Sequence, residues 1–388
     1  MSITSSAAFA DSKPHYHLLD GLRGVAALLV LWYHLFEGYA FAGGTRIEIF
    51  HHGYLAVDFF FILSGFVIGY AYDDRWKRTF TLKEFIQRRL IRLHPMVLLG
   101  AVLGVVTFCL QGSVQWDGTP IATSLLLLSF LCTLFFLPAL PGASYEVRGN
   151  GEMFPLNGPC WSLFFEYIGN LLYALFLRRL STQALRVLVV LLGVSLAAFA
   201  IFDVSGYGNI GVGWTLDGVN FAGGLLRMLF PFSMGLLLSR HFKPIRVRGA
   251  FWICTAILTL LFSVPYLEGV APICINGVYE AFCILFVFPL LICLGASGTT
   301  TDQTSTQICS FLGNISYPLY VIHYPILYLF YAWLIRNQYF TFAQTWIVAL
   351  SVYALCVLLA YLSLKRYDEP VRNYLAKRFL SKSQGKIR

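Results

Sequence analysis

Six ionisable side chains lie inside long apolar runs of this sequence, and their types suggest proton transfer beside a bound anion. They are Arg23, His34, Asp58, Glu166, Arg227 and His323. An ionisable group inside an apolar helix is a candidate functional residue by default, because its surroundings solvate it poorly. A histidine can take up and release a proton near neutral pH, and an arginine can hold a phosphate or a carboxylate.

Arg23 and His34 share one face of a predicted helix over residues 18–39. His34 follows Arg23 by eleven residues, which is about three turns and about 16 Å along the helix axis. With the N-terminus inside, Arg23 can hold a phosphate-type ligand near the inner surface, while His34 is an acid or base in the outer half. A purely structural role for both residues stays open as the alternative. In it, Arg23 extends to the membrane interface and His34 forms a hydrogen bond with a neighbouring carbonyl.

Asp58 enters the predicted span 54–72 at nearly the depth of His34. A short loop joins the two spans, so we expect them to be neighbours. An aspartate beside a histidine can fix the tautomer of the imidazole, which predicts that Asp58 assists His34 as a general base. The alternative is a structural ion pair between Asp58 and Arg227, in the span 220–239.

The spans 159–177 and 308–333 hold further candidates. Glu166 lies one or two turns from the outer end of its span, where it can help His34. Trp161 lies at the outer interface, where tryptophan is common in any membrane protein. His323 either lines an acyl or sugar pocket, with Trp161 and Arg227 as further pocket candidates, or packs at a kink caused by Pro318.

Three arginines precede the run 95–111, at Arg88, Arg89 and Arg92. The spacings i,i+3 and i,i+4 place them on a cationic face of a helix at the inner surface. Such a cluster often binds anionic lipid headgroups. The functional alternative is an anionic cofactor that carries phosphates.

The composition indicates that the apolar runs lie in a lipid bilayer. Hydrophobic residues make up 58% of the chain and charged residues 12%, whereas a soluble domain is about half apolar and about a quarter charged. The net charge is +9, but the basic residues gather in short loops between apolar runs. That pattern is typical of cytoplasmic loops beside anionic lipid, and it does not indicate nucleic-acid binding.

Eleven apolar runs are candidates for spans, and the positions of the charges decide which of them cross. The run 121–138 is short and polar in places. If it does not cross, most basic loops and the C-terminus stay inside, as the positive-inside rule requires. We therefore predict an all-α, polytopic membrane helix bundle of about ten transmembrane helices plus one re-entrant or interfacial segment, with both termini cytoplasmic. The membrane domain is expected over 18–374, between tails at 1–17 and 375–388.

Segments along almost the whole chain also share a family pattern. They are Leu19–Gly24 with His34, Gly53–Phe66, Arg88–Pro95, Trp161–Glu166, Ile315–Ile326 and Glu369–Arg372. In this order they resemble the membrane acyltransferase family usually called acyltransferase family 3, which includes O-acetylases of O-antigen, exopolysaccharide and Nod-factor sugars and macrolide acyltransferases. Val97 departs from the pattern, since an aromatic residue is common there.

The resemblance implies an O-acyltransferase of the bacterial inner membrane. It implies that His34 is the essential acid or base, and that Arg23 and the inner arginines serve an acyl-CoA donor, with acetyl-CoA expected as co-substrate. No tightly bound cofactor and no metal are expected. The implied partners are a glycan or glycolipid acceptor and the lipid bilayer. A separate extracytoplasmic transferase is a further possible partner, because some family members carry an extra domain that this chain lacks.

A glycan-intermediate transporter or flippase is the main alternative function. It would also use arginine, aspartate and histidine inside the membrane. Such transporters commonly contain inverted repeats and matched pairs of broken helices. The sequence shows neither feature, which favours the acyltransferase.

Overall fold

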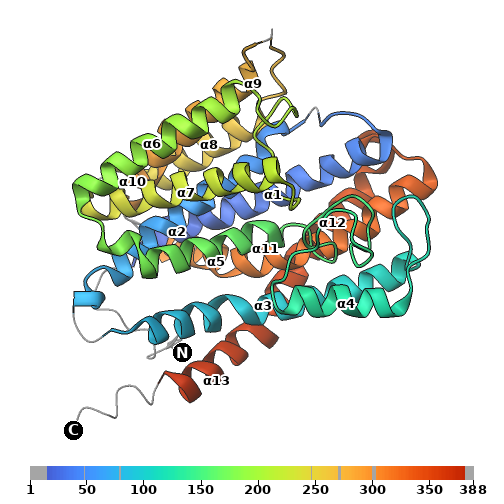
Figure 1. The fold of residues 1–388 in the computed structure, drawn as a ribbon, viewed down its shortest axis with the longest axis horizontal. Coiled ribbons are helices and arrows are strands. Elements are labelled where there is room, and N and C mark those ends of the chain that lie inside the picture. Colours follow the sequence, from blue (N-terminus) through green and yellow to red (C-terminus); the bar gives the residue numbers. More distant parts are fainter. Residues whose placement is uncertain are drawn as a thin grey trace.

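The computed structural model describes residues 15–47, 49–77, 80–245, 247–269, 272–298 and 303–380. These residues form a helical bundle, and the described part of the chain contains isolated β-bridges but no strand (Figure 1). The predicted all-α fold is therefore confirmed. The helices are α1 His17–Gly43, α2 Ala56–Tyr72, α3 Leu82–Gln111, α4 Thr123–Leu134, α5 Cys160–Leu175, α6 Thr182–Ile201, α7 Gly218–His241, α8 Ala250–Ser263, α9 Ile275–Phe282, α10 Phe288–Ser297, α11 Gln303–Asn337, α12 Phe342–Ser363 and α13 Glu369–Phe379.

Two helix pairs form the centre of the bundle, α1 with α11 and α2 with α7. Glycine permits their close approach. A Cβ atom on Gly24 would lie 2.4 Å from the Leu312 carbonyl oxygen, and one on Gly65 would lie 2.0 Å from that of Phe232. Small residues at such crossings allow backbones to pack closely within a membrane, where apolar side chains gain little by leaving lipid. These contacts position α1 and α2, which carry His34 and Asp58.

Nine helical stretches in the described ranges are long and apolar enough to cross a membrane. They account for nine of the ten predicted spans, with α9 and α10 joined by the π-helical stretch Cys283–Val287. The predicted span 250–266 is shorter than expected, because α8 has 14 residues. That is about 21 Å of helix, against a hydrocarbon core of about 30 Å. The helix ends at Ser263 because Pro265 disfavours helical backbone at the residue before it and cannot donate a backbone hydrogen bond.

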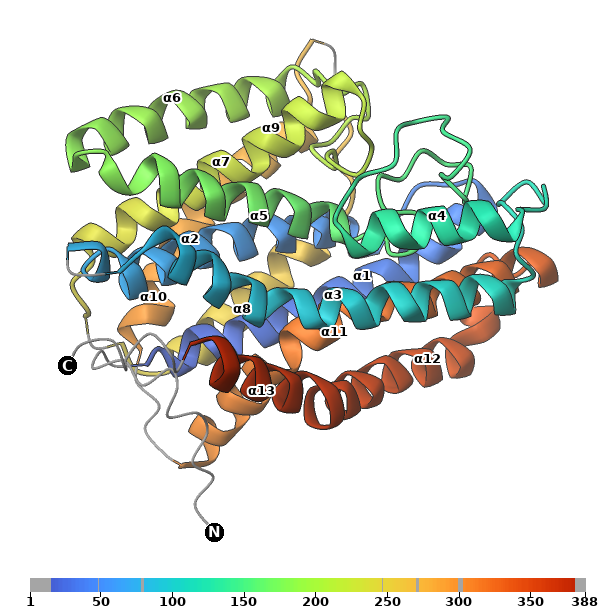
Figure 2. The ribbon, with the colours of Figure 1, turned by 60° about the horizontal axis from the view of Figure 1, so that its bottom comes forward.

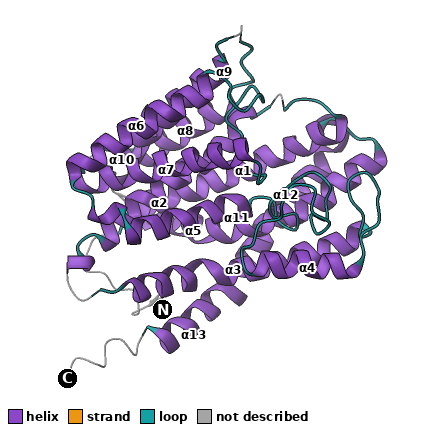
Figure 3. Cartoon of the chain, in the orientation of Figure 1, coloured by secondary structure: helices purple, strands orange, loops and turns teal. Residues whose placement is uncertain are grey.

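The run 121–138 forms α4, which has 12 residues and spans about 18 Å. The chain returns from α4 to the end of α3, since Arg148 Nη1 donates to Gln111 Oε1 at 2.6 Å. Figure 3 shows the connection between α4 and α5 as a long coil of loop. The chain thus leaves and re-enters the bundle at the same end. That this segment does not cross the membrane stays a prediction.

Several basic loops meet at the opposite end. Asp73, just after α2, accepts from Arg240 of α7 at 3.0 Å and from Tyr173 of α5 at 2.7 Å. The Arg178 guanidinium lies 4.0 Å from the Trp76 ring centroid. Helix α13 packs on the first half of α3 at this same end (Figure 2). We call it the basic end. Most of both predicted tails, residues 1–14 and 381–388, lies outside the described residues.

The path of α4 gives a test of topology. In a protein whose nine cysteines have been replaced, Ser144→Cys in the α4–α5 loop should react with a membrane-impermeant thiol reagent in intact cells. Gln183→Cys, at the basic end, should react only after permeabilisation, because basic loops remain cytoplasmic. The reverse pattern would overturn the predicted orientation.

Candidate active site

A cavity of about 120 Å³ opens among α1, α2, α3, α5 and α11. Its wall brings together four residues predicted from sequence, Arg23, Arg89, Arg92 and Glu166. Apolar side chains of α2 line one wall, and Ser162 and Tyr320 also line the cavity. The cavity therefore joins a cationic region to the middle of the bundle.

Arg23 is held within the bundle by α11. Its Nε donates to Ser316 Oγ and its Nη2 to the Gly313 carbonyl, both at 2.8 Å. The same Nη2 lies 3.2 Å from Asp20 Oδ1. These bonds orient the guanidinium along the cavity wall, so Arg23 does not simply extend to the interface.

Glu166 belongs to the cationic region and does not contact His34. It accepts from Arg89 Nη2 at 2.7 Å and from Ser64 Oγ at 3.1 Å. Glu166 lies far from His34 because α5 begins deep in the bundle. Asn157 Nδ2, just before this helix, donates to the Val321 carbonyl at 2.8 Å, deep within α11. Starting at that depth, α5 carries Glu166 toward the basic end, so its predicted assistance to His34 is corrected.

The three predicted arginines of α3 do not share one environment. Arg89 and Arg92 line the cavity, whereas Arg88 is not among its lining residues. The Arg88 guanidinium lies 5.9 Å from the Phe80 ring centroid instead. Arg92 is exposed and has no hydrogen bond or ion pair with the described residues. It is therefore the cation of this wall that is available to an anion.

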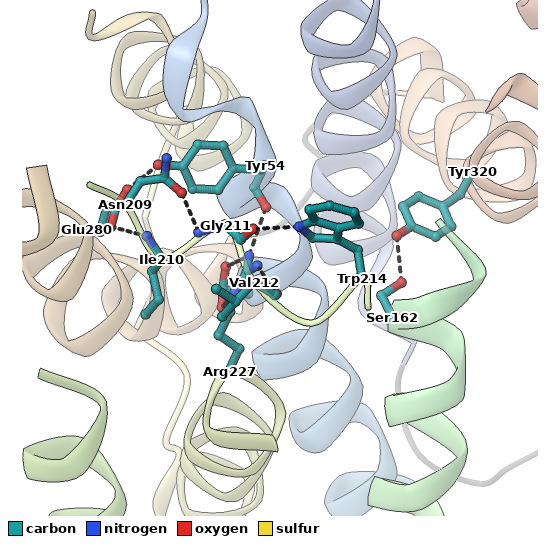
Figure 4. Close-up of polar contacts among 11 residues, drawn as sticks. Tyr54, Ser162, Asn209, Ile210, Gly211, Val212, Trp214, Arg227, Glu280 and Tyr320 are labelled. Atoms are coloured by element: carbon teal, nitrogen blue, oxygen red, sulfur yellow. Dashed lines mark hydrogen bonds and ion pairs between the residues drawn. The ribbon is translucent and has the colours of Figure 1, made fainter. Parts of the chain in front are cut away.

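Asp58 pairs with Arg227, which is the structural alternative raised above. Their charged groups approach to 2.6 and 3.1 Å, and the side chains are 0% and 1% exposed. Arg227 also donates to the carbonyls of Val212 and Tyr54 (Figure 4). The expectation that Asp58 orients His34 is wrong, because this part of α2 faces α7 and not the histidine of α1.

Trp161 lies beside this ion pair and is not part of the cavity wall. Its ring centroid is 5.2 Å from the Arg227 guanidinium carbon. Glu280 extends the polar cluster, accepting from Tyr54 Oη and from the Ile210 amide (Figure 4). Trp161 and Arg227 thus stabilise the junction between α2, α7 and the 203–217 loop, and neither lines the cavity.

His34 and His323 form a pair of imidazoles, with ring centroids 5.3 Å apart. His323 is fully buried, and its Nδ1 lies 2.9 Å from the Leu319 carbonyl. Tyr320 connects the pair to the cavity: it lines the wall, and its ring centroid lies 6.0 Å from that of His323. His34 and His323 themselves are not among the residues that line the cavity.

Glu37 is the partner of His34 that the sequence analysis missed. Its Oε2 lies 2.6 Å from His34 Nδ1. The same oxygen accepts from Tyr324 Oη at 3.0 Å, and it lies 3.1 Å from Tyr331 Oη, which is closer to the His34 carbonyl oxygen, at 2.5 Å. The i,i+3 spacing on one helix was the signal that could have found it.

The loop after α4 holds two further buried charged groups beside this site. Arg148 is 1% exposed, donates to the Pro155 carbonyl at 2.8 Å and lies 3.5 Å from the Tyr328 ring centroid. Glu152 accepts from Tyr328 Oη, and burial raises the pKa of Glu152 to about 7. These contacts fasten the loop onto α11.

A family model and individual relatives agree on the family to which this chain is similar. A family model described as an acyltransferase domain matches residues 16–364. Acyltransferase MdmB of Streptomyces mycarofaciens is 27% identical over 330 residues, covering 80% of this chain and 78% of that protein. Protein 2 in the picA locus of Rhizobium radiobacter is 37% identical over 175 residues, covering 42% of this chain and 84% of that protein.

A shorter match is to the peptidoglycan O-acetyltransferase OatA of Listeria monocytogenes, at 34% identity over 97 residues. It covers 24% of this chain and 14% of that much longer protein. No solved structure matches the chain.

The buried ion pair gives a test of stability. Asp58→Ala or Arg227→Ala should lower the free energy of unfolding by about 3–5 kcal/mol, because each change leaves a buried charge without its partner. Replacing both should cost less than the sum of the single changes. Thermal unfolding in detergent measures this, with Lys77→Ala in an exposed ion pair as the control without effect. Additive losses would contradict the pairing.

Proposed function

The chain belongs to the acyltransferase domain family, and we propose that it transfers a small acyl group, acetyl above all, from acyl-CoA to a hydroxyl of a cell-surface glycan or glycolipid. The observation that carries this proposal is the cavity lined by Arg23, Arg89 and Arg92, because another of its wall residues, Tyr320, lies beside His323, which in turn lies beside His34. The anion-binding Arg23 and the proton-accepting His34 lie about 16 Å apart along α1.

The arginine region suits the phosphates of CoA. Arginine holds phosphate oxygens through several donors at once, and Arg92 makes no hydrogen bond or ion pair with the described residues. A cavity of about 120 Å³ is smaller than the roughly 300–1,000 Å³ of a site for a complete drug-sized ligand. The cavity therefore takes the narrow pantetheine arm, while the nucleotide stays at its basic mouth.

His34 acts as the general base of the transfer. Its Nε2 takes the proton of the acceptor hydroxyl while the hydroxyl oxygen forms a bond to the thioester carbonyl carbon. The carbon–sulfur bond of the resulting intermediate then breaks. The CoA sulfur leaves with the proton that His34 returns, and the products are an ester and free CoA thiol.

The proposal also sets the sidedness of the reaction. The basic end faces the cytoplasm, where acyl-CoA is made, and both termini lie on that side. His34 lies closer to the opposite surface, where a glycan acceptor enters. In this proposal the protein spans the bacterial inner membrane. Handing the acyl group to a separate extracytoplasmic transferase is the alternative to direct transfer at His34.

Removal of the base tests the reaction. His34→Ala should reduce transfer of label from acetyl-CoA into envelope glycans by about 100-fold or more, the usual range for losing a positioned base. Labelled glycans are followed by mass spectrometry in membranes containing each variant. His241→Ala, an exposed histidine at the end of α7, is the matched control and should keep full activity.

Two outcomes would count against the proposal. Normal turnover by His34→Ala would remove His34 from the mechanism. Failure of the wild type to release CoA thiol from any of a panel of acyl-CoAs would reject the donor and favour the transporter.

A second test concerns the donor site. Arg92→Ala should raise KM for acetyl-CoA by about tenfold and leave kcat within about twofold, because Arg92 holds a part of the donor that does not react. Arg88→Ala, one turn away and off the cavity wall, is the control. Equal effects of the two changes, measured by CoA-thiol release, would show a general loss of surface charge and not a site.

A further inference from the structure

Glu37 is a carboxylate on α1 whose contacts gather around His34. It lies within a candidate membrane span, where a carboxylate is costly unless it has partners, and its side chain is only 28% exposed. One of its oxygens lies within hydrogen-bond distance of three atoms, His34 Nδ1, Tyr324 Oη and Tyr331 Oη. Two of these partners come from α11, so Glu37 ties the face of α1 that carries His34 to that helix.

We propose that Glu37 is the positioning residue of the acyl transfer, holding His34 in the tautomer and orientation that the reaction needs. The inference rests on the acyltransferase function proposed above. A carboxylate that accepts from Nδ1–H keeps the proton on that nitrogen, so Nε2 carries the free lone pair that can accept a proton. Tyr324 fixes the carboxylate by donating to it, and Tyr331 contacts both the carboxylate and the His34 carbonyl. These contacts restrain the imidazole.

His323 adds an independent observation. Its Nδ1 donates to the Leu319 carbonyl, which makes its Nε2 an acceptor, and that Nε2 is buried without a hydrogen-bond partner among the described residues. A buried polar atom of this kind is normally satisfied. The missing partner of His323 Nε2 must be a hydrogen-bond donor. A hydroxyl of an acceptor molecule bound beside His34 can supply it. His34 and His323 lie side by side, so His34 can accept from the reacting hydroxyl while His323 accepts from another hydroxyl of the same acceptor.

Glu37 neither gains nor loses a proton during the reaction. The hydroxyl proton moves to His34 Nε2, and the proton on Nδ1 stays in the bond to the carboxylate. The imidazolium that forms is stabilised by this neighbouring negative charge. When the CoA sulfur takes the Nε2 proton, the pair returns to its starting state.

Kinetics of CoA-thiol release test the role. Glu37→Gln should lower kcat by about 100-fold or more, because an amide can also donate to Nδ1 and so favour the wrong tautomer. KM for acetyl-CoA should stay within about twofold, since the donor site is distant. Glu37→Asp, which keeps the charge, should restore part of kcat. Glu268→Gln, an exposed carboxylate, is the matched control without effect.

The double variant separates positioning from simple stability. His34→Ala with Glu37→Gln should be no slower than His34→Ala alone, because Glu37 acts only through His34. Losses that multiply would overturn the proposal. So would wild-type kcat in Glu37→Gln.

A spectroscopic measurement decides the matter even if the acyltransferase function fails. In ¹⁵N-histidine-labelled protein, the signals of His34 are assigned by their loss in His34→Ala. We expect Nδ1 to carry the proton in the wild type and the tautomers to mix in Glu37→Gln. The same tautomer in both proteins would overturn the role of Glu37. A fixed wild-type tautomer without CoA release would reject only the proposed reaction.

Discussion

Asp58 and Arg227 are enclosed between α2 and α7, and their charges are tolerable there only because each satisfies the other. Desolvating two such groups costs several kcal/mol each. Two direct contacts and the backbone carbonyls of Tyr54 and Val212 compensate this cost. The pair therefore sets how α2 meets α7 and where the 203–217 loop rests. The face of α2 that lines the cavity depends on that arrangement.

The polar groups of the site lie in two regions. At the basic end, Glu166 and Arg89 pair, Ser316 and Gly313 hold Arg23, and Arg92 stays available. Further along α1, His34 is bound to Glu37 beside His323. Apolar side chains of α2 line the cavity beside the arginines. A long donor molecule with phosphates at one end and a reactive thioester at the other matches this distribution.

Much of this organisation was readable from the sequence. Apolar runs located the helices, and the placement of basic residues indicated that the segment around α4 does not cross. Arg23 and His34 could be placed on one face because helical spacing is periodic. Glu37 could have been found in the same way, three residues after His34, but its tyrosine partners on α11 lie almost three hundred residues away.

The sequence by itself determined the medium, the helices and the kinds of chemistry present, because these follow from composition and local periodicity. Only the tertiary structure decided which charge meets which. Asp58 faces Arg227 and not His34, because a helix has several faces and interhelical packing selects among them. Glu166 joins the arginines because a loop that folds into the bundle makes α5 begin deep, at Asn157. The sequence of a helix does not determine its rotation about its axis or its depth in the bundle, because both arise from contacts with helices distant in the chain.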